Sequence, residues 1–149
     1  MMGLEIIDKP FHVALHGYSG KVLNKNYAGT GKPLMDTMWK EIKSRGIKNK
    51  GINYWVYDKN DMLFTGVELA QDLPADLKME SKTINLSKYA YWKHIGPYTK
   101  LKIAYDGMHS ELAKRNLNFY FPFLEIYGHW TEDDTKLETE IIFSLTKQQ

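Results

Sequence analysis

The sequence predicts an α+β protein in which a strand–helix–strand–strand unit occurs twice in tandem. Its antiparallel strands should form a concave groove with the helices packed behind. Three observations predict this. Short runs of branched and aromatic residues flank two amphipathic stretches, residues 32–45 and 97–115. Residue types in the second half repeat those of the first at a constant spacing. One strand, residues 123–127, carries an acidic residue among apolar and aromatic neighbours.

The bulk composition narrows the class of protein. A chain of 149 residues can bury a core without disulfides, and it contains no cysteine. Its 20 basic and 18 acidic residues lack the strong basic excess of a nucleic-acid-binding surface. The N-terminus lacks the layout of a signal peptide, and no apolar run approaches the roughly 20 residues of a membrane span. We therefore expect a cytoplasmic protein that contacts neither nucleic acid nor membrane.

The first half predicts a strand, a loop, a helix and two further strands. These are residues 4 to about 15, with a bend at Pro10, then 19–31, 32–45, 52–57 and 62–70. Thr30 fits the N-cap of the helix and Pro33 its first turn, while Gly46 suits a left-handed terminator. Met38 and Ile42 belong to the apolar stripe of this helix.

The second half predicts the same succession: a strand, a helix and two strands. These are residues 83–94, 97–115, 123–127 and 137–145. The pair Gly96-Pro97 separates the first strand from the helix. Asn116 ends this helix in the place that Gly46 takes in the first half.

The two halves match at an offset of 70 positions. The matching pairs include Asp36 and Asp106, Met38 and Met108, Glu41 and Glu111, Arg45 and Arg115, and Tyr57 and Tyr127. At the same offset Trp55 falls on Glu125. One small unit cannot bury its apolar face alone, so we expect a single domain over residues 1–149, made of half-repeats 1–72 and 79–149. Equivalent strands should line a groove between the halves.

Glu125 is the main candidate for a functional residue. Side chains alternate along a strand, so Phe123, Glu125 and Tyr127 share one face, and Leu124 and Ile126 the other. A carboxylate between two aromatic residues lies either on a solvated face or in a pocket. In a pocket it needs a cationic or hydrogen-bonding partner, and that partner could be a ligand. Aromatic faces beside one carboxylate suit a lipophilic cation.

The candidate ligand-binding set joins this carboxylate to aromatic side chains. It contains Glu125, Tyr127, Phe123, Trp55, Tyr57, Trp92, Tyr105 and Trp39. The sequence leaves open which face of strand 83–94 lines the groove. His16 and His94 end the first strands of the two halves, where a backbone hydrogen bond is favoured over an acid–base role. No spacing typical of a metal site or a phosphate loop occurs, so we expect neither metal nor cofactor.

Four segments together resemble the GyrI-like small-molecule-binding domain. They are residues 89–98, the helix with Leu101 and Tyr105, residues 122–127 and residues 139–141. That domain also forms the effector-binding part of many AraC-type and MerR-type multidrug regulators. The resemblance implies a duplicated unit with a central glutamate in an aromatic pocket that meets cationic or polar drugs. Glu125 occupies the matching place. We expect no separate DNA-binding domain in this chain.

The resulting hypothesis is a stand-alone binder of amphipathic, often cationic, small molecules, acting in drug sequestration or effector sensing. Two alternatives stay open. The resemblance also implies a hydrolase of cyclopropane-containing genotoxins, with Glu125 as base and Tyr127 or Tyr105 as proton donor. The other alternative is a protein-interaction module similar to a gyrase inhibitor. The sequence leaves the oligomeric state, the ligand and the choice between binding and hydrolysis open.

Overall fold

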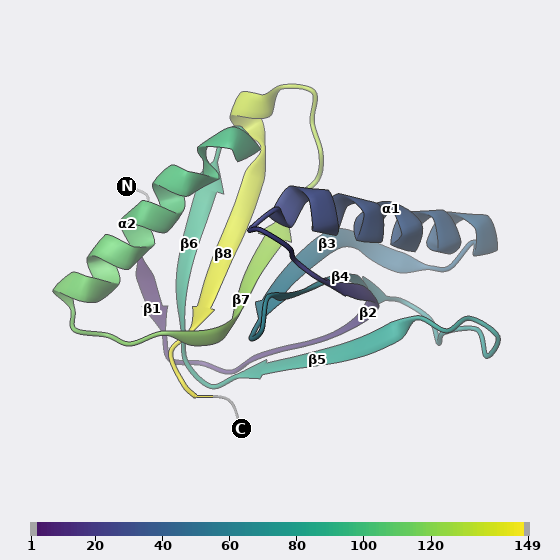
Figure 1. Cartoon of the computed structure of the whole chain (residues 1–149), viewed down its shortest axis with the longest axis horizontal. Coiled ribbons are helices and arrows are strands. Elements are labelled where there is room, and N and C mark those ends of the chain that lie inside the picture. Colours follow the sequence, from purple (N-terminus) through teal and green to yellow (C-terminus); the bar gives the residue numbers. More distant parts are fainter. Residues whose placement is uncertain (1–2, 148–149) are drawn as a thin grey trace. The chain divides into compact units, whose positions relative to one another are not determined.

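The computed structural model of the chain describes residues 3–147 (Figure 1). These residues form two compact units, one of residues 12–85 and the other of residues 3–11 with 86–147. In chain order the elements are β1 (Glu5–Ile7), β2 (Phe11–Lys21), α1 (Tyr27–Arg45), β3 (Asn49–Asp58), β4 (Met62–Leu69), β5 (Glu80–Leu86), β6 (Tyr89–Ile95), η1 (Tyr98–Lys100), α2 (Leu101–Lys114), β7 (Tyr120–Tyr127), η2 (Asp134–Lys136) and β8 (Glu138–Ser144). The α+β class and the repeated strand–helix–strand–strand unit are confirmed.

The two units arrange their strands in the same order. Strands β3, β4, β2 and β5 are neighbours in the unit of residues 12–85, and β7, β8, β6 and β1 in the other. The outer strands are exchanged between the repeats. Strand β1 precedes β2 in the chain but pairs with β6, whereas β5 precedes β6 but lies beside β2. Each group of four strands therefore contains one strand that precedes the other repeat in the sequence.

Both α-helices end in the same way, seventy positions apart. Gly46 and Asn116 follow the helices with positive φ angles of 62° and 52°. In each case the next amide donates back to the last helical turn at 3.0 Å. The predicted terminators and the register of the repeat are thus confirmed at the helix ends.

The beginning of α1 differs from the prediction. The helix starts at Tyr27 rather than at residue 32, because Asn26 caps it by accepting a hydrogen bond from the Gly29 amide at 3.1 Å. Gly31, which suggested a loop, lies inside the helix. A Cβ at this position would stand 2.4 Å from the Trp55 ring, so glycine allows the helix and the indole to pack together.

Two predicted strands are each divided in the structure. The strand predicted from residue 4 to about 15 forms β1 and the start of β2, which are separated at the expected bend around Pro10, and residues 83–94 form parts of β5 and β6. At both breaks the sequence contains polar residues, Asp8-Lys9-Pro10 and Ser87-Lys88, and there the chain passes from one compact unit to the other.

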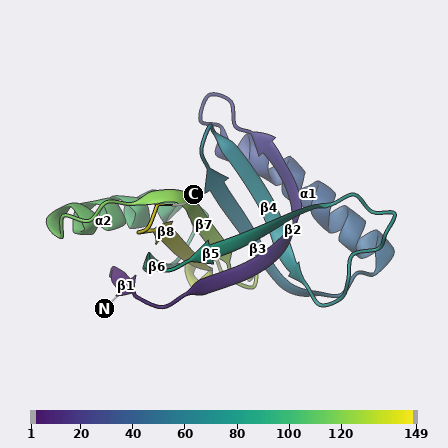
Figure 2. The same cartoon turned by 90° about the horizontal axis from the view of Figure 1, so that it is seen from below.

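Each helix packs against one face of the sheet of its own unit (Figures 1 and 2). Beneath α1 the core contains Met38, Ile42 and Val67. The core beneath α2 contains Met108, Leu112, Ile141 and Phe143 among others. Within residues 3–147, neither helix combines the length and apolar character that crossing a bilayer requires.

The cap of α1 gives a stability prediction. Nothing lies within 4 Å of a Cβ added to Gly46, so only the backbone penalises a substitution there. We expect Gly46→Val to lower the free energy of unfolding by about 1–2 kcal/mol, the cost of a left-handed conformation for an ordinary residue. Gly46→Asn is the matched control and should cost less than half as much, because Asn116 adopts this conformation in the second repeat. Urea denaturation measures both, and equal losses would contradict the equivalence of the two caps.

Candidate functional site

Glu125 lies on the inner, helix-covered face of its unit. It is 5% exposed and pairs across β7 and β8 with Ile141, a fully buried member of the core beneath α2. Phe123 and Tyr127 share this face, as the alternation of side chains predicts. The side chain of Glu125 is therefore buried and does not lie on a solvated face.

Two tyrosine hydroxyls hold the carboxylate. Tyr105, on α2, donates a hydrogen bond to Oε2 at 2.5 Å. Tyr127, two residues along the same strand, donates to Oε1. Each carboxylate oxygen thus accepts a hydroxyl, which compensates part of the cost of burying a charged group.

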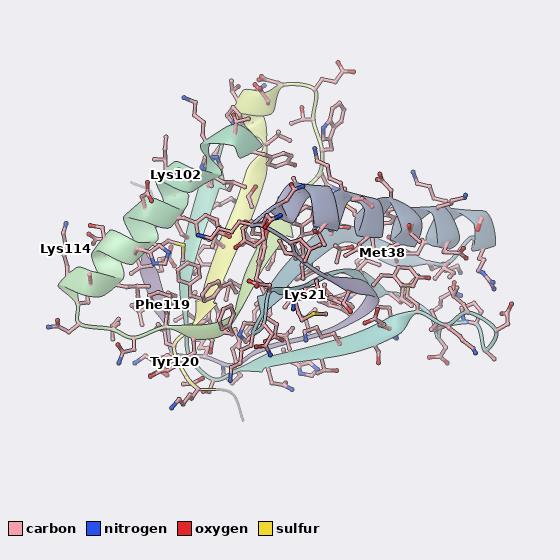
Figure 3. All side chains as sticks on the ribbon, in the orientation of Figure 1. Lys21, Met38, Lys102, Lys114, Phe119 and Tyr120 are labelled. Atoms are coloured by element: carbon pink, nitrogen blue, oxygen red, sulfur yellow. The ribbon has the colours of Figure 1, made fainter. Side chains whose placement is uncertain are left out.

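Helix α2 brings Tyr105 to the site through its amphipathic pattern. Its outer side carries Lys102 and Lys114, which point away from the sheet (Figure 3) and have side chains 84% and 71% exposed. Tyr105 lies on the inner side with Met108 and packs against the core. The helix therefore fixes the direction from which the hydroxyl reaches Glu125.

Aromatic rings surround the two tyrosines. Tyr98 meets the ring of Tyr127 edge-on, with centroids 5.4 Å apart and an interplanar angle of 82°. Phe143 lies 5.9 Å from Tyr105 and 4.6 Å from Phe123 between ring centroids. Burial raises the pKa of Tyr98, so its ring is a neutral phenol at physiological pH. Aromatic rings therefore surround the two tyrosines that bind the Glu125 carboxylate.

Trp92 belongs to the same face as Glu125. It pairs with Ile141, which in turn pairs with Glu125, so the three side chains form one row across the sheet. A Cβ on Gly107 would lie 2.7 Å from the Trp92 ring, and the indole packs against the core beneath α2. Ala90, Trp92 and His94 thus face the helix.

Trp55, Tyr57 and Trp39 lie in the unit of residues 12–85. Trp55 is 7% exposed and lies under α1. Tyr57 meets Tyr27 edge-on with centroids 5.6 Å apart. Trp39 donates from Nε1 to Asn53 Oδ1 at 3.1 Å. Their participation in one groove with Glu125 stays a prediction.

The two histidines require one correction. His94 donates from Nε2 to the Pro97 carbonyl at 3.0 Å, the favoured backbone role. In one unit Thr65 pairs with both Tyr18 and Trp55. In the other unit Ile141 pairs with both Trp92 and Glu125, so Tyr18 and Trp92 occupy equivalent positions. His16 lies two residues before Tyr18 and is therefore equivalent to Ala90, not to His94. The sequence comparison matched them because each histidine lies near the end of the strand predicted to open its half.

Tyr98 was absent from the candidate set although it contacts Tyr127. The signal was available in the sequence. Tyr98 follows Gly96-Pro97 directly, and a residue at the start of a helix lies near the ends of the strands beneath it.

A comparison with protein families decides the affiliation of the chain. The profile described as a GyrI-like small molecule binding domain matches residues 9–146. The chain belongs to the GyrI-like small-molecule-binding domain family. Among curated proteins, none matches.

Solved structures share the GyrI-like fold. The EcmrR C-terminal domain is 17% identical with a TM-score of 0.71, and the match covers 99% of this chain and 98% of that one. SAV2435 bound to tetraphenylphosphonium is 17% identical, with a TM-score of 0.53 and coverages of 98% and 94%. A hydrolase from Listeria innocua is 12% identical, with a TM-score of 0.59 and coverages of 97% and 92%.

The tyrosine–glutamate contacts give a second stability prediction. Tyr127→Phe removes a hydroxyl that donates to a buried carboxylate, so the free energy of unfolding should fall by about 1.5–3 kcal/mol. Tyr120→Phe, on the same strand, is the matched control and should change it by less than about 0.5 kcal/mol. Urea denaturation compares the two variants. Equal effects would show that the hydroxyl contact contributes nothing specific.

Proposed function

We propose that this GyrI-like chain binds amphipathic, often cationic, small molecules, with Glu125 as the charged contact. The observation that carries the proposal is the burial of the Glu125 carboxylate among aromatic rings, with one tyrosine hydroxyl on each oxygen. Sequestration of drugs or sensing of an effector in the cytoplasm belongs to the same proposal.

The chemistry of the site favours a diffuse cation. A carboxylate away from water attracts a positive charge more strongly than an exposed one, because less solvent screens it. The faces of Tyr98, Tyr105 and Tyr127 can add cation–π contacts. A large organic cation is weakly hydrated, so removing its water on entry costs little free energy. An ammonium or metal ion is strongly hydrated, and its dehydration would cost much more. The rings therefore favour lipophilic cations over small hydrated ones.

The relatives support this choice. SAV2435 is described as bound to tetraphenylphosphonium, a lipophilic cation. EcmrR is described in complex with DNA, and its C-terminal domain shares the fold of this chain. By analogy, ligand binding here would serve sequestration or the sensing step of a regulator. Trp55, Tyr57, Trp39 and Trp92 are proposed as further aromatic contacts.

Charge removal at Glu125 tests the proposal. Glu125→Gln keeps the shape of the side chain, so binding of tetraphenylphosphonium should weaken by about 1–3 kcal/mol, the scale of a charge-assisted contact. The neutral ligand triphenylphosphine oxide should lose much less, because its binding would depend on the rings. Isothermal titration calorimetry measures both affinities. Equal losses of affinity for the two ligands would show that the charge of Glu125 does not contribute specifically to binding the cation.

Glu140→Gln is the matched control. Glu140 also accepts a tyrosine hydroxyl, that of Tyr91, but it pairs with Ile126 and so lies on the opposite face of the sheet. Burial and this hydrogen bond raise the pKa of Tyr91. We expect Glu140→Gln to leave the affinity for tetraphenylphosphonium unchanged. A loss as large as that of Glu125→Gln would indicate a general effect of removing charge.

A substitution at Trp55 tests whether the unit of residues 12–85 contributes to ligand binding. If its ring contacts the ligand, Trp55→Ala should weaken binding of ethidium, a planar cation, by about 1–3 kcal/mol. Because Trp55 is buried under α1, Trp55→Phe is a gentler second variant that retains a ring and should lose less. Circular dichroism checks the fold of both variants. Unchanged affinity in a folded Trp55→Ala protein would confine this residue to the core.

Hydrolysis is the second candidate function, favoured by the same cluster. The cluster combines a base, the Glu125 carboxylate, with two proton donors, the tyrosine hydroxyls, within hydrogen-bond distance. Some structural neighbours are described as hydrolases. Mass spectrometry of a recovered cyclopropane-containing ligand separates the functions, since a binder returns it unchanged and a hydrolase adds water.

A further inference from the structure

The unit of residues 12–85 contains a cavity of about 380 Å³ that the tyrosine–glutamate cluster does not use. Its lining combines apolar and charged side chains: Ser19, Val56, Asp58, Lys59, Asn60, Met62, Leu63, Phe64, Glu80, Ser81 and Lys82. A volume of several hundred cubic ångströms is typical of small-molecule sites.

The cavity lies on the face of the sheet opposite α1. Val56 pairs with Phe64, and Phe64 pairs with Ser19, so these three side chains share one face. The neighbouring row contains Trp55, which lies on the other face against Gly31 of α1. The cavity is therefore separate from the helix-covered surface that carries the predicted aromatic contacts of this unit.

Strand β5 forms one wall of the cavity. Glu80 accepts hydrogen bonds from the Ser19 amide at 2.9 Å and the Ser19 hydroxyl at 2.6 Å, which fixes the start of β5. Lys82 forms an ion pair with Asp58 at 3.1 Å. The two residues come from β5 and β3, the outer strands of this four-stranded group, which a flat sheet would separate by about 14 Å. The sheet must curl to bring them together over the floor.

The equivalent surface of the other unit is filled differently. The row Ser19, Phe64 and Val56 corresponds to Lys93, Glu140 and Ile126. Lys93 is paired with Glu138 at 2.6 Å, and Glu140 accepts the Tyr91 hydroxyl. The outer strand β1 also has only 3 residues, whereas β5 has 7. The apolar floor and its charged wall are thus particular to the unit of residues 12–85.

We propose that this cavity is a second binding site, which takes small zwitterions with an apolar body. Its charged lining residues, Asp58, Glu80, Lys59 and Lys82, balance in charge, so the site favours a ligand without net charge. The buried side chains of Val56 and Phe64 supply an apolar floor. A zwitterion presents both an ammonium and a carboxylate to these groups.

Binding exchanges one ion pair for two. The ligand ammonium replaces Lys82 beside Asp58, and the ligand carboxylate pairs with the released Lys82 ammonium. The two side chains are 30% and 37% exposed, so they can change partners without unfolding the sheet. A ligand with only one of these charges leaves one protein group without its former partner, which is unfavourable. The exchange therefore selects zwitterions over singly charged analogues.

Nuclear magnetic resonance of the full chain tests the site with L-phenylalanine as the probe. L-phenylalanine should shift the amide signals of Ser19, Phe64 and Lys82 in a saturable manner. L-phenylalaninamide, which is a cation, and 3-phenylpropionate, an anion, should each bind at least about tenfold more weakly. Lys82→Met and Asp58→Asn should each weaken L-phenylalanine binding by about tenfold or more.

Lys50→Met is the matched control, because Lys50 forms an exposed ion pair with Glu68 at 3.2 Å on the same unit, outside the cavity lining. It should leave L-phenylalanine binding unchanged, and the ligand-free spectra show that each variant is folded. The proposal is overturned if L-phenylalanine causes no saturable shift at these amides up to about 10 mM, if a singly charged analogue binds equally well, or if neither cavity variant weakens binding.

Discussion

The hydrogen bonds that Tyr105 and Tyr127 donate to Glu125 constrain the whole unit around them. A buried carboxylate is tolerated only where donors meet it, so β7 must present Glu125 to α2 and not to the opposite face. A slip of one residue against β8 would exchange its place with that of Leu124 or Ile126. The polar cluster therefore specifies both the strand register and the rotation of the helix, in addition to its chemistry.

The repeat retains the backbone arrangement while the packing between helix and sheet has diverged. In both units an indole fits against a helical glycine, Trp55 at Gly31 and Trp92 at Gly107. These pairs are not related by the offset of 70, since Trp55 lies on β3 and Trp92 on β6. Glycine lets helix and sheet approach closely wherever a large ring is present. The same physical solution thus occurs at different positions of the repeat.

The sequence predicted what depends on local chemistry and missed what depends on distant contacts. The caps at Gly46 and Asn116, the helix stripes and the face of Glu125 follow from neighbouring residues, and they are confirmed. The start of α1 was concealed because Gly31 is suited to Trp55, which lies far along the chain. The exchange of β1 and β5 left no local signal, because the residues within a strand do not specify which neighbouring strand it pairs with. Tyr105 was a candidate, but its bond to Glu125 required the packing of α2.

The two sites that we propose for ligands lie where the repeats differ. At one pair of equivalent strand positions, an indole, Trp55, stands where the other repeat has the carboxylate of Glu125. On the opposite face, an apolar row under β5 stands where the other repeat has paired charges. A duplicated scaffold keeps its core positions similar because both copies must pack the same elements. Its remaining positions are free to differ, and here they provide an anionic aromatic surface in one unit and a charge-balanced cavity in the other.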